Sequence, residues 1–282
     1  MVAILPAGDA LLANSSVLLS VYGHHIVHQT MGVEDDRLLS PNSWTAHHPR
    51  ALHVRWSDAD NRALVAARYP HLLAMYDSLF LTVQKTDVAR LLYLHAFGGL
   101  YADADYECGG NLFHLLEQGT DIQIVRSPIL LNEVFQNSLM FARHRHLPFF
   151  RQALETILEI HAFLHTGCTL SASCSLLRLF GNPFTVRIAN VAITQYFTGP
   201  AALDKTLVLN PHLHTDLSPL PVEGFFYGPY AWHRHANSWV TIWSSLLPIG
   251  GAFGIFCLLL FVAVALSCHV ENRRARERNE YR

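Results

Sequence analysis

The amino-acid sequence predicts an α/β domain with a mostly parallel sheet, followed by one membrane-spanning helix near the carboxyl terminus. Short apolar runs of strand length alternate with amphipathic stretches of helix length, which is the pattern of such a domain. A long apolar run without charged residues lies late in the chain and predicts the membrane helix. With 51% apolar residues, a chain of 282 residues can bury one sizeable core.

Residues 1–23 are partly apolar and precede the predicted domain. Asp9 interrupts the apolar residues, and no basic segment precedes them, so the stretch is a poor secretory signal peptide. We interpret residues 1–23 as a weakly apolar leader or as a truncated anchor.

The first two predicted strands are residues 25–28, which Gln29 follows, and residues 52–56. Ser57 and Asp60 have the spacing of a capping box and predict that a helix begins directly after the second strand. Strands and helices alternate in this way in α/β domains with parallel sheets. Ligands of such sheets bind at the carboxyl ends of the strands.

Residues 85–105 predict a helix, a stop at two consecutive glycines, and a short strand that ends in an acidic pair. Asp87 and Arg90 lie one turn apart on the helix, and Asp103 and Asp105 follow the strand. Two carboxylates at the carboxyl end of a strand can bind one hard divalent cation, which in turn neutralises a diphosphate. The stretch therefore predicts the chemistry of a nucleotide-sugar site.

Simpler interpretations of the same residues stay open. An Asp-x-Asp pair often only solvates a loop, and Asp87 with Arg90 could form a surface ion pair worth about 0.3–0.5 kcal/mol. The position of Asp87 and Arg90 favours a functional role, because they lie just upstream of the acidic pair in the sequence.

Further elements of the domain are predicted from periodicity and turn residues. Apolar periodicity predicts a helix over residues 112–118 and a strand over residues 122–125. Phe150, Leu154 and Ile157 belong to an apolar stripe that predicts a long amphipathic helix later in the chain. The predicted domain as a whole covers residues 24–239.

Residues 240–270 contain no Asp, Glu, Lys or Arg, whereas a membrane span needs only ~20 apolar residues. The best window for the transmembrane helix is residues 244–267, and the alternative is a buried helix in a globular core. The tail, residues 268–282, is rich in arginine, so we expect it to be cytosolic and the domain to be lumenal. This topology predicts a Golgi or other secretory-pathway membrane.

Composition excludes several other classes of protein. A formal net charge of -2 gives no electrostatic argument for nucleic acid as a partner. The 18 histidines are scattered along the chain, and the sequence does not predict a zinc site. Five cysteines are too few for a disulfide scaffold. The functional prediction therefore depends on the acidic pair, Asp103 and Asp105.

Asp-x-x-Arg on a helix, then Gly-Gly-Leu-Tyr, then Asp-x-Asp resembles the signature of the glycosyltransferases that carry a DXD sugar-binding region, family 32 in the usual classification. Within this family the chain looks most similar to the inositol phosphorylceramide mannosyltransferases and to initiating α-mannosyltransferases. The resemblance covers nearly all of residues 24–239. It implies a GT-A nucleotide-sugar-binding domain, a Mn²⁺ or Mg²⁺ cofactor, and retention of the anomeric configuration.

The resemblance also implies roles for the central residues. Asp105 would bind the metal directly, and Asp103 would touch the metal or the ribose. Asp87 and Arg90 would contact sugar and ribose hydroxyls or the phosphate. Tyr101 would pack under the sugar, although a tyrosine that only fills the sheet explains the sequence equally well.

Motifs on either side of the central stretch resemble those of the family as well. His28 and Gln29 correspond to a segment near the nucleotide base, with a plain core strand as the alternative. Residues 137–140 resemble the family's Asn-containing strand, in which Asn137 would contact sugar or acceptor, with a capping asparagine as the alternative. In the segment that closes the domain, Ser238 and Trp239 would bind the diphosphate, and Trp239 could instead mark a membrane interface.

The closing segment would also supply a third metal ligand. Either His233 or His235 would complete the metal shell with a ring nitrogen, and spacing does not choose between them. The metal and this segment would then stabilise the departing diphosphate, while Asp87 and Arg90 fix the sugar.

The predicted activity is transfer of mannose from GDP-mannose to inositol phosphorylceramide, because an anchored domain suits an acceptor held in the membrane. A regulatory membrane subunit is a further candidate partner. The alternatives are a mannosyl- or galactosyltransferase that acts on protein glycans, and a non-catalytic membrane subunit that retains the fold. A haloacid-dehalogenase-type phosphatase is disfavoured, because the acidic pair does not follow the first strand.

Overall fold

The described residues of the computed structural model are 4–5, 8–30, 41–79, 81–127, 135–166, 194 and 197–234. The chain divides into two compact units, residues 1–236 and residues 237–282, and every described residue belongs to the first. No helix among the described residues is long and apolar enough to cross a membrane. The predicted membrane helix 244–267 and the tail 268–282 lie outside the described residues and stay predictions.

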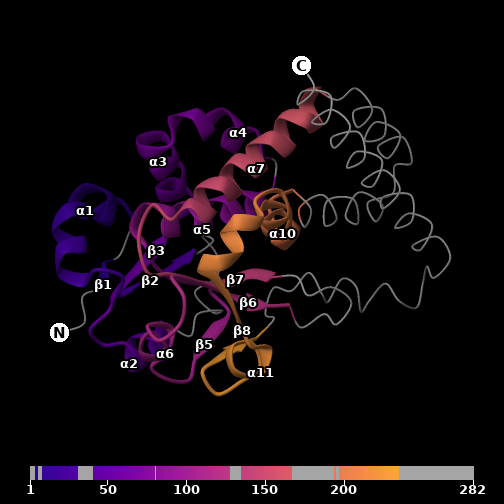
Figure 1. Ribbon diagram of the computed structural model, residues 1–282. Helices are drawn as coiled ribbons and strands as arrows, with labels where there is room; N and C mark the ends of the chain where they lie inside the picture. The colour runs from indigo at the N-terminus through magenta and orange to yellow at the C-terminus, as the bar shows by residue number, and fades with distance from the viewer. Residues whose placement is uncertain are drawn as a thin grey trace, which may run out of the picture. The chain divides into compact units, whose positions relative to one another are not determined.

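A seven-stranded mixed sheet forms the centre of the described unit (Figure 1). In spatial order its strands are β1 (Ile4–Leu5), β3 (Leu52–Trp56), β2 (Ile26–Thr30), β4 (Gly99–Ala102), β7 (Phe135–Ala142), β6 (Ile122–Arg126) and β8 (Leu217–Leu220). β7 runs antiparallel to both of its neighbours, and every other pair in this sheet, as described, is parallel. The prediction of an α/β domain with a mostly parallel sheet is therefore confirmed.

Helices cover both faces of the sheet (Figure 1). The helices on one face are α1 (Gly8–Tyr22), α3 (Asp58–Arg68), α4 (Leu73–Ser78), α5 (Thr82–Phe97), α7 (Pro148–Thr166) and α10 (Pro200–Leu209). The other face carries α2 (Pro41–His47), α6 (Leu112–Leu116), α11 (Val222–Phe225), and an antiparallel ribbon of β5 (Tyr106–Cys108) and β9 (Ala231–His233). Two 3-10 helices, η1 (Pro70–Leu72) and η2 (Pro211–Asp216), lie between these elements.

Alternate residues of the central strands enter two separate hydrophobic cores. On β2, Ile26 packs into the core on the α5 side, and Val27 packs into the core on the α6 side. On β7, Met140 packs into the core on the α5 side, and Phe141 packs into the core on the α6 side. A sheet that is buried on both faces leaves the ends of its strands as the places where polar side chains gather.

Local signals predicted several elements correctly. β3 coincides with the predicted strand 52–56. The capping box that begins α3 is present, because the amide of Asp60 donates to Ser57 Oγ (3.2 Å) and the amide of Ser57 donates to Asp60 Oδ2 (2.9 Å). The predicted helix 112–118 is shorter in the structure, where α6 ends at Leu116.

Helix α1 packs within the same unit as the predicted domain. Its Leu11 is fully buried, and Gly8 lies so close to Trp56 that a Cβ at residue 8 would lie 2.2 Å from the indole ring. The described part of residues 1–23 therefore contributes to the core of the first unit. Their interpretation as a leader or truncated anchor stays a prediction.

The step from α5 to β4 depends on Gly98 and Gly99, which have φ values of 71° and 95°. Residues other than glycine rarely adopt this backbone region. At Gly99 a Cβ would also lie 2.5 Å from the carbonyl oxygen of Ile26, because β4 lies directly against β2. The two glycines therefore end α5 and begin the strand that carries the acidic pair.

We expect Gly99→Ala to lower the free energy of unfolding by about 1–3 kcal/mol, because backbone strain adds to the clash with Ile26. Gly110→Ala is the matched control, because a Cβ there meets only Tyr230, at 3.9 Å. We expect the control to change stability by less than about 1 kcal/mol. Thermal unfolding of the full-length chain measures both, and equal melting temperatures for the two variants would contradict the prediction.

Candidate functional site

Asp103 and Asp105 lie in the turn that follows the carboxyl end of β4. The amide of Asp103 donates to the carbonyl of Ser138 on β7 (2.9 Å), and the amide of Arg234 donates to the carbonyl of Asp105 (3.0 Å). Within the turn, the amide of Tyr106 donates to the carbonyl of Asp103 (3.0 Å). Backbone hydrogen bonds from three segments of the chain therefore hold the acidic pair in place.

The strand β9 brings His233 to the acidic pair. Its Nε2 lies 3.4 Å from Asp105 Oδ1, and the ligand atoms of Asp103, Asp105 and His233 all lie within 4.8 Å of one another. Phe226 stacks on the imidazole with ring centroids 4.9 Å apart, and Tyr106 packs against it edge-on at 4.7 Å. Two carboxylates and one imidazole are suitable donors for a divalent cation such as Mn²⁺.

A buried arginine connects the acidic pair to helix α5. The side chain of Arg90 is 6% exposed, and its Nη1 lies 3.2 Å from Asp103 Oδ1 and donates to the carbonyl of Asn137 (2.8 Å). Its Nη2 lies 3.2 Å from Asp87 Oδ1. Burial lowers the pKa of Arg90, but Asp103, Tyr101, Asp87 and Tyr93 together raise it by more, so the pKa lies above its ordinary value. The guanidinium therefore stays charged.

Asp87 is 4% exposed, and both of its carboxylate oxygens are bound within the protein. Oδ1 faces Arg90 and accepts from Asn137 Nδ2 (2.9 Å), while Oδ2 accepts from Thr198 Oγ1 (2.9 Å). Burial raises the pKa of Asp87, and the charge of Arg90 opposes that rise. Asp87 therefore orients Arg90, and neither oxygen of its carboxylate is turned toward solvent.

Tyr101 is buried beside Arg90 and Asp103. Its hydroxyl donates to Asp103 Oδ1 (2.6 Å), and Arg90 Cζ lies 4.9 Å from the centre of its ring. Burial holds the pKa of Tyr101 well above its usual value, so the phenol keeps the proton that it donates. Asp103 Oδ1 thus has two partners, whereas Oδ2 is hydrogen-bonded to none of the described residues. Asp103 can therefore offer Oδ2 to a cation.

His28 and Gln29 point to opposite faces of β2. Gln29 Nε2 donates to the carbonyl of Asp103 (3.5 Å) and so lies beside the acidic pair. His28 is fully buried on the α5 side, where its Nδ1 accepts from the Trp56 indole (3.2 Å) and its Nε2 donates to the carbonyl of Gly98 (2.9 Å). Burial lowers the pKa of His28 to about 4, so the ring is neutral. His28 therefore supports the step from α5 to β4 from within the core.

Most of the predicted site residues gather in one region. In chain order they are Gln29, Asp87, Arg90, Tyr101, Asp103, Asp105, Asn137 and His233. His235, Ser238 and Trp239 lie outside the described residues. No local pattern predicted that the carbonyl of Ser138 would accept from Asp103 or that the hydroxyl of Thr198 would donate to Asp87, because each pair is distant in the sequence.

Comparison with known proteins points to the same stretch of chain. Residues 35–123 match the family model described as glycosyltransferase sugar-binding region containing DXD motif. Inositol phosphoceramide mannosyltransferase 3 of Schizosaccharomyces pombe is 33% identical over 98 residues, which cover 32% of this chain and 26% of that protein. Inositol phosphoceramide mannosyltransferase 2 of the same organism is 32% identical over 98 residues, which cover 32% and 27%. The chain thus matches about a quarter of the length of each relative.

Two solved structures are similar at a lower level. PaToxG Glycosyltransferase has a TM-score of 0.44 and 12% identity, over 74% of this chain and 82% of that chain. The UDP-bound glycosyltransferase domain from the YGT toxin has a TM-score of 0.40 and 13% identity, over 59% and 52%. Likeness at this level does not identify a common fold.

The family match contains both pairs of charged residues. Asp87, Arg90, Asp103 and Asp105 all lie within residues 35–123, and the buried arginine bridges the two pairs in space. Residues 35–123 of this chain are therefore similar to the glycosyltransferase sugar-binding region that contains the DXD motif.

Proposed function

We propose that the chain is a metal-dependent, retaining glycosyltransferase with a GT-A nucleotide-sugar-binding domain. The cluster of Asp103, Asp105 and His233 carries the proposal, because its two acidic members lie in the DXD region of the family and follow the carboxyl end of β4. Sheets of this kind bind their ligands at that edge. A nucleotide sugar is the ligand that the family match supports.

A Mn²⁺ or Mg²⁺ ion held by Asp103, Asp105 and His233 would neutralise the charge that develops on the departing nucleoside diphosphate. Asp105 is the more direct ligand in this proposal. Asp103 has one oxygen engaged by Arg90 and Tyr101, and it offers Oδ2 to the ion. His235, Ser238 and Trp239 would approach the diphosphate from the segment that follows β9.

Asp87 and Arg90 act as positioning residues in this proposal. Asn137 and Thr198 hold Asp87, and Asp87 holds the guanidinium that faces Asp103. A charge that is preorganised in this way needs no rearrangement at the moment of reaction. In this proposal Asp87 acts indirectly, through Arg90, whereas the sequence predicts that it contacts sugar and ribose hydroxyls or the phosphate.

The acceptor attacks the sugar from the face that the diphosphate leaves. A bond forms between the acceptor oxygen and the anomeric carbon, the bond from that carbon to the phosphate oxygen breaks, and the acceptor proton passes to a phosphate oxygen. Among the carboxylates of the described site, Asp87 is enclosed by its partners, and Asp103 and Asp105 face the proposed ion. This arrangement favours a single-step transfer over a covalent intermediate.

An exposed aromatic patch supports an acceptor at a membrane surface. The patch consists of Tyr227, Tyr230 and Trp232, which are 44%, 39% and 49% exposed, and Trp232 immediately precedes His233. Tyrosine and tryptophan are enriched where proteins meet the membrane interface. The predicted membrane helix 244–267 follows shortly after in the sequence. We therefore place the acceptor in the membrane next to this patch.

The finer proposal names GDP-mannose as donor and inositol phosphorylceramide as acceptor. The names of the two relatives support it, since both are inositol phosphoceramide mannosyltransferases. The protein would then act in the Golgi or another secretory-pathway membrane, with its domain in the lumen and with a regulatory membrane subunit as a candidate partner.

Exchange of either acidic residue for asparagine should lower kcat for sugar transfer by about 10²–10³-fold, because a preorganised electrostatic group is lost. The two variants should differ in metal affinity. The Mn²⁺ concentration that gives half-maximal rate should rise at least about tenfold in Asp105→Asn and by a smaller factor in Asp103→Asn. Titration of Mn²⁺ into membranes that contain the full-length protein measures both effects.

Asp216→Asn is the matched control for these variants, because Asp216 is exposed on η2 and lies outside the cluster. Its transfer rate should equal that of the wild type. Full activity of Asp105→Asn would refute a catalytic cation at this cluster. Equal shifts in the two variants would refute the more direct role of Asp105.

A panel of labelled nucleotide sugars tests donor and acceptor together. Membranes that contain the full-length chain are incubated with labelled GDP-mannose, UDP-galactose or UDP-glucose, with inositol phosphorylceramide added, and the lipid and protein fractions are counted separately. We expect label from GDP-mannose in the lipid, and none with an Asp103→Asn, Asp105→Asn double variant. Label that enters only protein would refute the lipid acceptor, and label that enters only from a UDP-sugar would refute the donor.

A further inference from the structure

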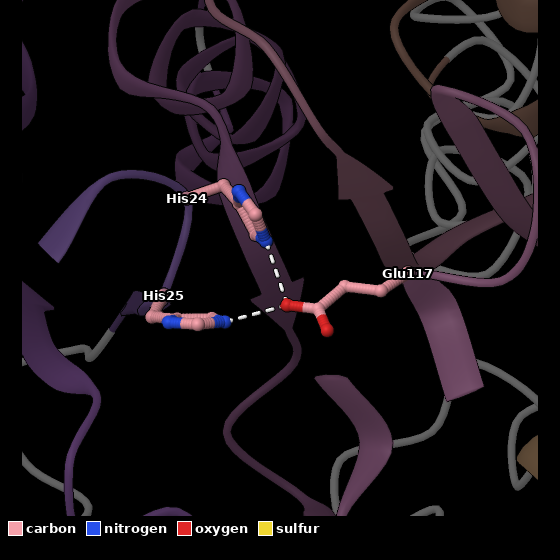
Figure 2. A group of neighbouring side chains, drawn as sticks. All are labelled: His24, His25 and Glu117. Atoms are coloured by element: carbon pink, nitrogen blue, oxygen red, sulfur yellow. Dashed lines mark hydrogen bonds and ion pairs between the residues drawn. The ribbon is translucent and has the colours of Figure 1, made fainter. Parts of the chain in front are cut away.

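Three side chains that the proposed activity does not use converge on one point. Figure 2 shows the rings of His24 and His25 pointing toward the carboxylate of Glu117. His24 Nε2 lies 2.9 Å and His25 Nε2 lies 2.6 Å from Glu117 Oε1, and the three ligand atoms lie within 4.8 Å of one another. The side chains are 27%, 48% and 36% exposed, so the group is open to solvent on one side.

The turn between α1 and β2 makes this convergence possible. Neighbouring residues within a strand point to opposite faces, so two consecutive histidines on a strand would not share a partner. His24 and His25 precede β2, and Gly23 turns the chain there with a φ of 56°. The amide of His25 donates to the carbonyl of Tyr22 (2.9 Å), and the carbonyl of His25 accepts from Leu52 (2.9 Å). The two rings lie 4.6 Å apart, centre to centre.

Two backbone hydrogen bonds fix the position of Glu117. It caps the carboxyl end of α6, where its amide donates to the carbonyl of Phe113 (2.9 Å) and its carbonyl accepts from Arg143 Nη2 (3.0 Å). The ring of Phe113 packs edge-on against His25 at 4.9 Å. Phe141 packs edge-on against His24 at 5.8 Å. Ring contacts therefore hold the two imidazoles, and backbone hydrogen bonds fix the position of Glu117 beside them.

We propose that His24, His25 and Glu117 bind a Zn²⁺ ion. Two imidazole nitrogens and one carboxylate oxygen are a known donor set for zinc, with water as the fourth ligand, whereas Mg²⁺ and Ca²⁺ prefer oxygen. Zinc bonds of about 2.0–2.2 Å in a tetrahedron separate the ligand atoms by about 3.3 Å, so partly exposed side chains need to move by less than about 1 Å.

The zinc site is separate from the candidate catalytic cluster. His24 and His25 precede the amino end of β2, whereas Asp103 and Asp105 follow the carboxyl end of β4, which runs parallel to β2. The two sites therefore lie at opposite ends of neighbouring strands. An ion here would join the turn before β2 to the end of α6, which are more than 90 residues apart, as the spacings of 93 and 92 residues to Glu117 show. Zinc would stabilise the folded state, because it binds the folded chain and not the unfolded one.

The test uses the full-length chain in detergent, with Asp103→Asn and Asp105→Asn introduced so that the acidic cluster does not contribute to the count. Bound Zn²⁺ is measured by equilibrium dialysis, and thermal unfolding is followed with and without the ion. We expect one equivalent of zinc. We also expect a rise in melting temperature of about 5–10 °C when free Zn²⁺ exceeds its dissociation constant about a hundredfold.

Two variants locate the ion. His24→Asn and Glu117→Gln should each lose that equivalent and the zinc-dependent rise in melting temperature, while their metal-free melting temperatures stay close to the parent. His114→Asn is the matched control, because His114 is an exposed histidine on α6, which Glu117 caps. X-ray absorption of the zinc-loaded parent should show nitrogen or oxygen ligands at about 2.0–2.1 Å, including two imidazoles. Zinc binding that persists in both variants, or the absence of binding in the parent, would overturn the proposal.

Discussion

The buried guanidinium of Arg90 is the interaction on which the rest of the candidate site depends. A cation that has left water is stable only when its partners surround it, and here Asp87, Asp103 and the carbonyl of Asn137 do so. These partners come from α5, from the end of β4 and from β7, so one charge ties three elements together. The reversed direction of β7 contributes to this, because it places Asn137 and Ser138 next to the turn that carries the acidic pair.

The parallel strands β2 and β4 separate two polar groups that have different tasks. At the carboxyl ends, buried charges hold the carboxylates in a fixed direction, which suits chemistry on a diphosphate. At the amino end of β2, His24, His25 and Glu117 are partly exposed, and they connect the turn before β2 to the end of α6. The proposed catalytic site and the proposed zinc site thus lie at opposite ends of two neighbouring parallel strands.

Local patterns predicted the parts of the fold that local forces decide. The strand 52–56, the capping box behind it and the glycine stop before β4 could be inferred from neighbouring residues, and all are confirmed. The direction of β7 and the contact between Arg90 and Asp103 depend on pairing between distant segments. No local pattern carries that information. For the same reason the sequence showed scattered histidines where the structure brings His24 to Glu117, 93 residues away.

The late position of β9 in the chain affects how the protein is made. During translation the two aspartates and Arg90 leave the ribosome well before β7, Thr198 and His233. At that stage the guanidinium lacks the strand that covers it, and the carboxylates lack their imidazole neighbour. A half-finished polypeptide therefore lacks the complete Asp103, Asp105 and His233 cluster, which forms only when β9 pairs with β5.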